Sequence, residues 1–131
     1  MNENNVHGEN MGEKYNPKIR KLSKNPKNYG KPVKNDITVS ESYTGPCGDT
    51  MNFFLKIDND TIKLARFTTN GCACAKASAS QTMMLIEGKT VEYAEILEPK
   101  DVDNALGGLP RDHKHCAELA IRTLRKALDR S

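Results

Sequence analysis

The chain has 131 residues, which is the length of a single domain with a modest core. Its net charge of +3, its lack of Trp and its content of three Phe and four Tyr do not indicate a nucleic-acid partner. No stretch approaches the roughly 18 consecutive apolar residues of a membrane span, and residues 1–12 lack the apolar run of a signal sequence. We therefore expect a cytoplasmic protein without a membrane partner.

The four cysteines are the most informative residues of the composition. In a reducing compartment, thiols are more often metal ligands or catalytic groups than halves of disulfides. The composition therefore favours a protein that binds a metal or handles sulfur.

The N-terminal part of the chain divides into a tail and the start of a domain. Residues 1–12 are rich in Asn and Glu and predict a disordered tail, and residues 13–131 predict one domain. Asn16 as N-cap and Pro17 as first helical residue predict a short helix that ends near Asn25. Residues 14–34 hold eight Lys or Arg and no acidic residue, which indicates either a solvated face, the commoner case, or a surface for an acidic protein.

The middle of the chain shows the alternation of half-buried strands. A period of two predicts strands over residues 37–43 and 51–57, and a turn at residues 58–60 leads to a third strand over residues 61–69. Short connections between consecutive strands favour an antiparallel meander.

The remainder of the chain is predicted to be helical. One helix runs from about residue 72 to residue 86 and stops at Gly88, a second covers residues 90–97, and the last follows a break at Gly107 and Gly108. Strands followed by helices indicate an α+β domain. We expect a small three-stranded antiparallel sheet, helices packed on one of its faces, and a helical C-terminus.

Three turns bring candidate metal ligands to the ends of these elements. Cys47 and Asp49 lie in a glycine-rich turn between two strands, and Cys72 lies where a helix begins. His115 and Cys116 open the last helix, where their side chains diverge by about 100°, so that one ligates while the other supports. Thiolates mixed with harder donors are typical of metal sites, and the helix N-terminus favours the thiolate of Cys72.

Other interpretations of these residues stay open. Cys116 also fits a buried core cysteine on the apolar stripe of the last helix, and Cys74 at its spacing from Cys72 is more often a packing residue than a ligand. His113 is expected to be a solvated residue or a support for a ligand. The spacings between the cysteines match no short metal signature, so spacing alone does not define the ligand set.

A series of short motifs then adds a family resemblance. They follow one another at residues 25–30 (NPKNYG), 47–49 (CGD), 65–67 (ARF), 71–72 (GC), 77–80 (ASAS), 88–90 (GKT), 109–110 (LP) and 115–116 (HC). With these motifs the chain resembles, from Tyr15 to Ala127, the iron-sulfur cluster assembly scaffolds of the IscU and NifU N-terminal family. Each motif alone is common, whereas their order is highly specific.

The resemblance implies a small α+β scaffold rather than an enzyme. A 2Fe-2S cluster is built on it from iron, electrons and sulfide delivered by a cysteine desulfurase, and is passed to acceptor apo-proteins; zinc often occupies the same pocket when no cluster is present. The resemblance implies thiolate ligands at Cys47, Cys72 and Cys116, with Asp49 and His115 as candidates for the fourth place. It ranks Cys116 first and Cys72 second as acceptors of a persulfide.

The chain departs from the family pattern at two places. Bacterial relatives carry Leu-Pro-Pro-Val-Lys before the His-Cys pair, and a dedicated Hsp70-type chaperone reads that segment. Here residues 109–113 read LPRDH, so chaperone-assisted release in its usual form is not expected. Cys74 stands where many relatives have a small non-thiol residue, and it is a candidate for an extra sulfur ligand, a persulfide relay or a disulfide partner of Cys72.

Three alternative functions would also depend on the cysteines of this chain. A zinc-dependent sulfur acceptor of the SufU type would hold zinc with Cys47, Asp49, Cys72 and Cys116. That branch typically carries an extra insertion before its last cysteine, and the segment at residues 88–109 is too short to contain it. A structural zinc domain would use the same ligands without transferring sulfur. A dithiol redox protein would use Cys72 and Cys74.

Overall fold

The computed structural model describes residues 15–129 of the chain, and the predicted tail at residues 1–12 lies outside them. Within this range the strands form one sheet in the order β2-β3-β4, with both neighbouring pairs antiparallel. The strands are β2 (Val39–Thr44), β3 (Thr50–Asp58) and β4 (Thr61–Thr69). The predicted meander is confirmed, although β2 begins two residues later than expected because a short 3-10 helix, η1 (Lys34–Asp36), precedes it.

The turn between β3 and β4 shows why the meander closes so tightly. Asn59 and Asp60 have φ angles of 56° and 62°, which place two consecutive residues in the left-handed region. Asn and Asp tolerate this conformation better than other non-glycine residues, and a two-residue left-handed turn matches the twist of paired strands. The polar turn at residues 58–60 therefore sets the register of the hairpin.

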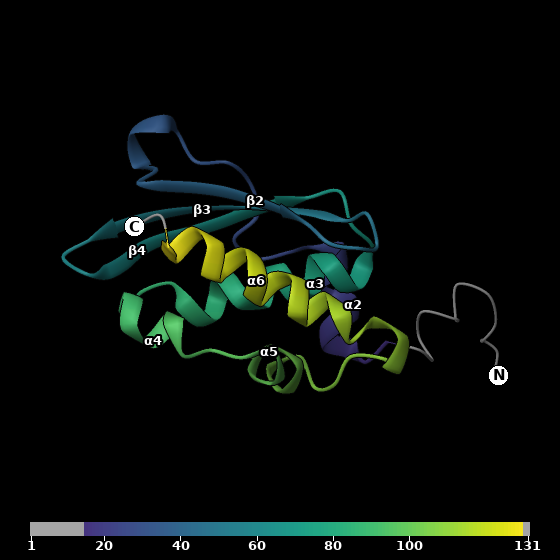
Figure 1. The fold of residues 1–131 in the computed structure, drawn as a ribbon. Helices are drawn as coiled ribbons and strands as arrows, with labels where there is room; N and C mark the ends of the chain where they lie inside the picture. The colour runs from purple at the N-terminus through teal and green to yellow at the C-terminus, as the bar shows by residue number, and fades with distance from the viewer. Residues whose placement is uncertain (1–14, 130–131) are drawn as a thin grey trace, which may run out of the picture.

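The helices lie together on one face of the sheet (Figure 1). They are α2 (Pro17–Lys24), α3 (Ala73–Ile86), α4 (Val91–Glu95), α5 (Pro99–Ala105), the 3-10 helix η2 (Arg111–His113) and α6 (His115–Asp129). Helix α5 lies outside the predicted elements, because Pro99 follows the predicted helix at residues 90–97 and a proline commonly marks the end of a helix. Pro99 instead occupies the first position of α5, where its missing N–H costs nothing, and the Asp101 carboxylate accepts the N–H of Glu98 at 2.8 Å.

Helix α3 is the centre of the packing. It contacts β4 on one side and α2, α5 and α6 on the others, and Figure 1 shows it beside α6 beneath the sheet, with α5 farther from the strands. Residues 77–80, with the sequence ASAS, are all fully buried. Small side chains let neighbouring backbones approach closely, so α3 and its N-terminal residue are held from several directions.

The side chain of Asn16 connects the start of α2 to the segment that precedes the last helix. Asn16 caps α2 by accepting the N–H of Ile19 at 3.0 Å, and its Nδ2 donates to the carbonyl of Leu106 at 2.9 Å. A Cβ on Gly107, whose φ is 83°, would lie 3.1 Å from that Nδ2. The glycine break before the last helix therefore leaves room for the capping residue of the first.

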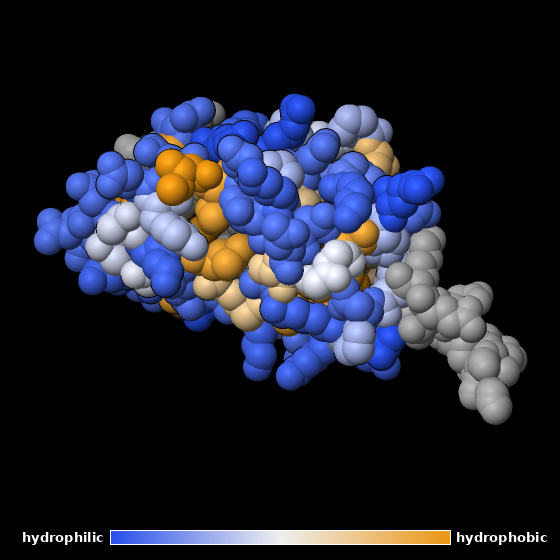
Figure 2. Space-filling model, turned by 90° about the horizontal axis from the view of Figure 1, so that it is seen from below, coloured by the Kyte–Doolittle hydropathy of each residue, from blue (hydrophilic) through white to orange (hydrophobic). Residues whose placement is uncertain are grey.

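The outer surface of the helices is mostly hydrophilic (Figure 2). Apolar side chains gather in a small area at the end of the molecule where Figure 1 places α4. Ile96, the C-cap of α4, is 71% exposed, the largest value for a large apolar residue among those described. In the described part of the chain no helix combines the length and the apolar character needed to cross a bilayer.

Candidate metal centre

Three side chains from separate elements converge at one end of the helical layer. Cys72 is the N-cap of α3, His113 ends η2, and Cys116 is the second residue of α6. One ligand atom of each lies within 4.8 Å of the others. Cys72 is exposed, His113 is half-buried and Cys116 is fully buried, so the group reaches from the surface into the core. We call these residues the inner triad.

A glycine allows the close approach at Cys72. A Cβ on Gly71 would lie 2.5 Å from the Cβ of Ala75 and 3.0 Å from Oδ2 of Asp49. Because real Cβ atoms do not tolerate such distances, only glycine fits before Cys72. The same distances place the Asp49 carboxylate against the turn that leads into α3, as expected for a candidate ligand beside Cys72.

The two thiols of the inner triad have different pKa values. A hydrogen bond from Cys116 lowers the pKa of Cys72 to about 5 against the opposing effect of burial. The N–H groups of Ala75 and Cys74 add to this stabilisation, although no full side-chain cap bond forms at the helix start. The same hydrogen bond, together with burial and the nearby negative charge, raises the pKa of Cys116. One thiolate and one thiol therefore face each other at neutral pH.

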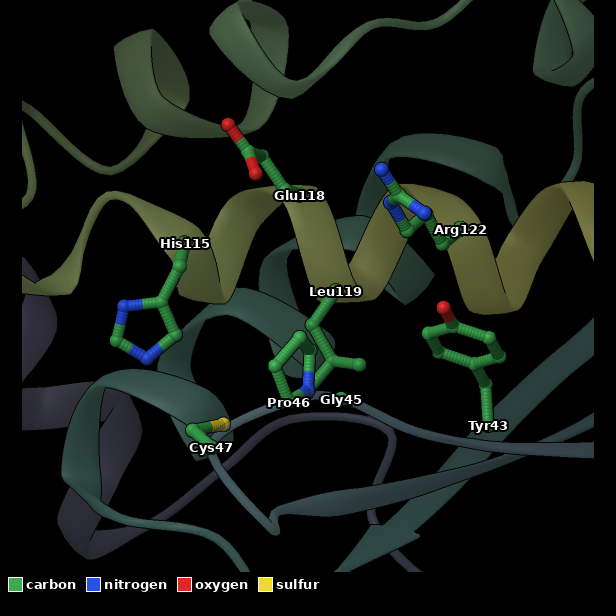
Figure 3. Close-up of a pocket in the computed structure, with 8 residues that line it drawn as sticks. All are labelled: Tyr43, Gly45, Pro46, Cys47, His115, Glu118, Leu119 and Arg122. Carbon is green, nitrogen blue, oxygen red and sulfur yellow. The ribbon is translucent and has the colours of Figure 1, made fainter.

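Cys47 and His115 lie on the outer side of α6. They face each other across a cavity of about 150 Å³ that is also lined by Leu119, Arg122 and Tyr43 (Figure 3). Cys47 is exposed in a turn closed by hydrogen bonds between residues 45 and 49, and it lies outside the inner triad. His115 is also exposed, but its Nε2 lies 3.8 Å from Sγ of Cys116. Cys116 therefore links the inner triad to this outer pair, Cys47 and His115.

Cys74 has a different environment from the other cysteines. It is the second residue of α3, is fully buried in the core and does not belong to the inner triad. Its thiol is hydrogen-bonded to the hydroxyl of Tyr15. Burial, followed by the interactions with Cys74, raises the pKa of Tyr15 to about 12.

His113 is the residue that sequence reasoning did not place at the site. It was expected to be solvated or to support a ligand, whereas one of its ring nitrogens lies within 4.8 Å of the sulfurs of both Cys72 and Cys116. Its N–H donates to the carbonyl of Pro110 at 2.9 Å, which closes η2 and turns the residue inward. The sequence signal was Pro110 itself, because a proline commonly begins a tight turn.

The inner triad has dimensions close to those of a tetrahedral metal site. A metal at about 2.3 Å from each sulfur separates its sulfur ligands by about 3.8 Å, so closure requires movements of about 1 Å or less. Two thiolates and an imidazole suit zinc and iron rather than calcium or magnesium. The outer pair offers a further sulfur and a further nitrogen at the surface.

Comparisons with known proteins identify the family of the chain. The family described as the NifU-like N-terminal domain matches residues 14–130. An iron-sulfur cluster assembly scaffold protein IscU from Aquifex aeolicus is 38% identical over 121 residues, which cover 90% of this chain and 76% of the relative. A scaffold protein IscU from Archaeoglobus fulgidus is 36% identical over 114 residues, covering 87% and 74%.

A solved structure shows the same fold. The crystal structure of a proposed iron-sulfur cluster assembly scaffold for the SUF system from Fervidobacterium islandicum superposes with a TM-score of 0.66. The two sequences are 25% identical, and the match covers 87% of this chain and 96% of that one. The sheet with helices on one face is therefore shared with a solved structure described as such a scaffold.

Proposed function

Because the chain belongs to the NifU-like N-terminal domain family, we propose that it is a scaffold on which an iron-sulfur cluster is assembled and from which the cluster is transferred. The cargo we propose is a 2Fe-2S cluster. Its iron comes as Fe²⁺, and its sulfide comes from a cysteine desulfurase together with reducing electrons. Acceptor apo-proteins then take the finished cluster.

One observation carries this proposal: the thiols of Cys72 and Cys116 meet in the inner triad, although they come from different helices. Iron-sulfur clusters are held by cysteine thiolates, and the separation of these sulfurs is close to that of two ligands on one metal. Cys47 supports the proposal from the opposite side, since its exposed turn lies across the cavity from His115, the neighbour of Cys116 (Figure 3).

The proposed ligands have different freedom to move. Cys72 and Cys116 are attached to two packed helices, whereas Cys47 is attached to a surface turn that includes Gly48 at a φ of 92°. We assign the three thiolate places to these cysteines. Asp49, beside Gly71, and His115, beside Cys116, are the predicted candidates for the fourth place in the complete cluster.

Sulfur entry needs an accessible thiolate, and both candidates belong to the inner triad. The thiolate attacks the outer sulfur of the desulfurase persulfide, a new S–S bond forms on the scaffold, and the desulfurase thiolate leaves. Two electrons from a reductant then release the transferred sulfur as sulfide. Cys116 is the first candidate by family resemblance, but it is fully buried and its pKa is raised, so the helix start must open before it can react. The exposure and low pKa of Cys72 support the second candidate. Cys74 would serve as a relay or extra ligand only by leaving the core.

The partners of the proposal follow from this role. A desulfurase and acceptor proteins must both reach the end of the molecule where Cys47 and Cys72 are exposed. An Hsp70-type chaperone would have to recognise residues 109–113 in an altered form, LPRDH. We place the protein in the cytoplasm and assign it a carrier role rather than an enzymatic one.

The test is anaerobic reconstitution of the full chain with Fe²⁺, cysteine, a cysteine desulfurase and a reductant. We expect equal amounts of iron and acid-labile sulfide on the protein, visible thiolate-to-iron charge-transfer bands, and transfer of both elements to an apo-ferredoxin. Retention of one zinc ion without labile sulfide would refute the scaffold and support a SufU-type sulfur acceptor or a structural zinc domain. Full activity of the Cys47→Ala variant in a dithiol assay would instead support a redox protein.

A further inference from the structure

We infer that His113 is a metal ligand of this chain and that, with Cys72 and Cys116, it holds the first metal ion to arrive. The inference rests on the proposed function, since that ion is the first iron of the cluster, or zinc when iron is absent. It goes beyond that function because it assigns a ligand, His113, that is neither Asp49 nor His115. The three ligand atoms lie within 4.8 Å of one another before any metal binds.

The ring of His113 has a nitrogen that lacks a partner. Nδ1 is buried and makes no hydrogen bond to any described residue, although the ring as a whole is 20% exposed. Buried polar atoms in folded proteins are nearly always paired, and an exception calls for a missing partner such as an ion. A nitrogen of this ring lies within 4.8 Å of the sulfurs of Cys72 and Cys116, and we assign Nδ1 to a metal ion shared with them.

The other nitrogen of His113 faces a carboxylate. Nε2 lies 4.0 Å from Oδ1 of Asp112. Histidines that ligate a metal usually direct their second nitrogen toward a carboxylate, a carbonyl or a water, which selects the tautomer and orients the ring. With Nε2 directed toward this carboxylate, Nδ1, the atom without a partner, is the nitrogen left for the metal.

The surroundings of His113 hold the ring in place. Tyr15 meets it edge to face, with 5.9 Å between ring centroids and 84° between the planes. The ring of His115 stacks with it, with 6.0 Å between centroids and 30° between the planes. The backbone of His113 is fixed by the hydrogen bond to Pro110 that closes η2. A ring held by these contacts is oriented before the metal arrives, which reduces the entropy lost on binding.

The competing residues lack this geometry. His115 reaches Cys116, at 3.8 Å, but it is exposed and does not belong to the inner triad. Figure 3 shows its ring on the Cys47 side of α6. Asp49 also lies outside the triad, against Gly71. The structure thus separates an inner position for the first ion from an outer position at which Cys47 and His115 complete the cluster.

The test uses Co²⁺ as the probe, with the full-length, chelator-treated protein under reducing conditions. Co²⁺ in a tetrahedral site gives visible ligand-field bands, and thiolate ligands add charge-transfer bands. We expect His113→Ala to weaken Co²⁺ binding by at least about 10-fold, since the loss of even a supporting residue costs that much. Added imidazole should restore the wild-type bands in this variant. Arg111→Ala, in the same turn and exposed, is the matched control and should bind Co²⁺ as the wild type does.

His115→Ala distinguishes the two histidines, because it should weaken Co²⁺ binding less than His113→Ala does. Wild-type bands and affinity in His113→Ala, with their loss in His115→Ala, would overturn the assignment. Circular dichroism checks that each variant is folded, and His113→Gln, which keeps a polar side chain of similar size, is the second variant. Labile sulfide on the reconstituted wild type is measured in parallel. Its absence would refute the scaffold function, whereas the Co²⁺ comparison would still decide the role of His113.

Discussion

The thiol of Cys116 donates a hydrogen bond to the thiolate of Cys72, so that two neighbouring sulfurs carry opposite protonation states. Cys116 is fully buried and Cys72 is exposed at the start of α3. The charge therefore sits on the sulfur that water and the helix N-terminus stabilise best. The protein without metal has its more reactive sulfur at the surface.

The first prediction concerns the reactivity of Cys72 in the metal-free protein. Its pKa of about 5 means that the thiolate fraction is nearly complete at pH 7 and falls only as the pH falls through about 5. Alkylation of the Cys72 peptide by iodoacetamide, followed by mass spectrometry, should therefore be nearly constant between about pH 6 and pH 8. An ordinary thiol, with a pKa of about 8.5, would react faster by almost tenfold per pH unit in this range.

Cys116→Ala is the informative variant for this measurement. It removes the hydrogen bond that contributes most to the low pKa, so the midpoint of the alkylation profile should move upward toward the value of a free thiol. Urea-denatured wild type provides the reference profile. A folded wild type whose Cys72 rate rises like that of the denatured chain would contradict the assigned protonation states.

The second prediction separates the four cysteines. Replacing Cys47, Cys72 or Cys116 singly with Ser should abolish most of the iron and labile sulfide after reconstitution. Cys74→Ala should retain both, because Cys74 is fully buried and lies outside the inner triad. This variant should lose about 1 kcal/mol of unfolding free energy, since the hydrogen bond with Tyr15 is removed. Loss of labile sulfide in Cys74→Ala would instead make Cys74 a sulfur ligand or relay.

The third prediction concerns Asp103, which holds the segment before the metal centre. Burial opposes its ionisation, but the N–H of Leu109 at 2.6 Å and the ammonium of Lys114 at 2.7 Å lower the pKa of the carboxyl. Asp103→Asn should therefore lower the unfolding free energy by about 1–2 kcal/mol at pH 7. A lowered pKa stabilises the fold above the unfolded value of about 3.9, and the contribution is lost as the pH falls through the folded value.

Urea unfolding of the wild type and Asp103→Asn at pH 7 and pH 3 measures this contribution. The difference between the two proteins should be largest at pH 7. It should shrink at pH 3, which lies below the unfolded pKa of about 3.9, because protonation of the unfolded chain removes part of the contribution. Lys100→Ala, an exposed change on the same helix α5, serves as the control. A difference that grows on acidification would show that Asp103 is not stabilised as a carboxylate.

The fourth prediction tests the NPKNYG motif. Asn28 has a φ of 64°, and its Nδ2 donates to the carbonyl of Ala65 at 3.0 Å and to Oε1 of Glu87 at 3.2 Å. Asn28→Ala loses both bonds and strains the left-handed backbone, so it should cost about 2–3 kcal/mol. Asn28→Gly loses the bonds without the strain and should cost about 1 kcal/mol less. Thermal unfolding of both variants checks the order, and equal losses would exclude a contribution from backbone strain.

The sheet was predictable from the sequence, whereas one helix was not. Alternation over residues 51–57 and the Asn59 and Asp60 turn depend on neighbouring residues only, so local pattern was sufficient. Helix α5 was missed because Pro99 both ends helices and begins them. Whether a helix begins at Pro99 depends on Val102, because the burial of Val102 against the other helices stabilises the short segment.

The candidate site was predictable as a set of residues but not as a geometry. Cys72 at a helix start indicated a thiolate, and its lowered pKa agrees with that expectation. The convergence of Cys72 with Cys116 depends on the packing of α3 against α6, which no local pattern encodes. The inward turn of His113 depends on a single 3-10 turn after Pro110, which no residue pattern indicates, whereas His115 is a candidate through the family resemblance.

The turn that carries Cys47 contains Gly48 and is exposed, whereas Cys72 and Cys116 extend from helices packed in the core. In the proposed cluster, a docking protein would thus displace the Cys47 sulfur without unpacking either helix. Release of the cargo is then separated from unfolding of its carrier, and the emptied carrier remains folded for the next round of loading.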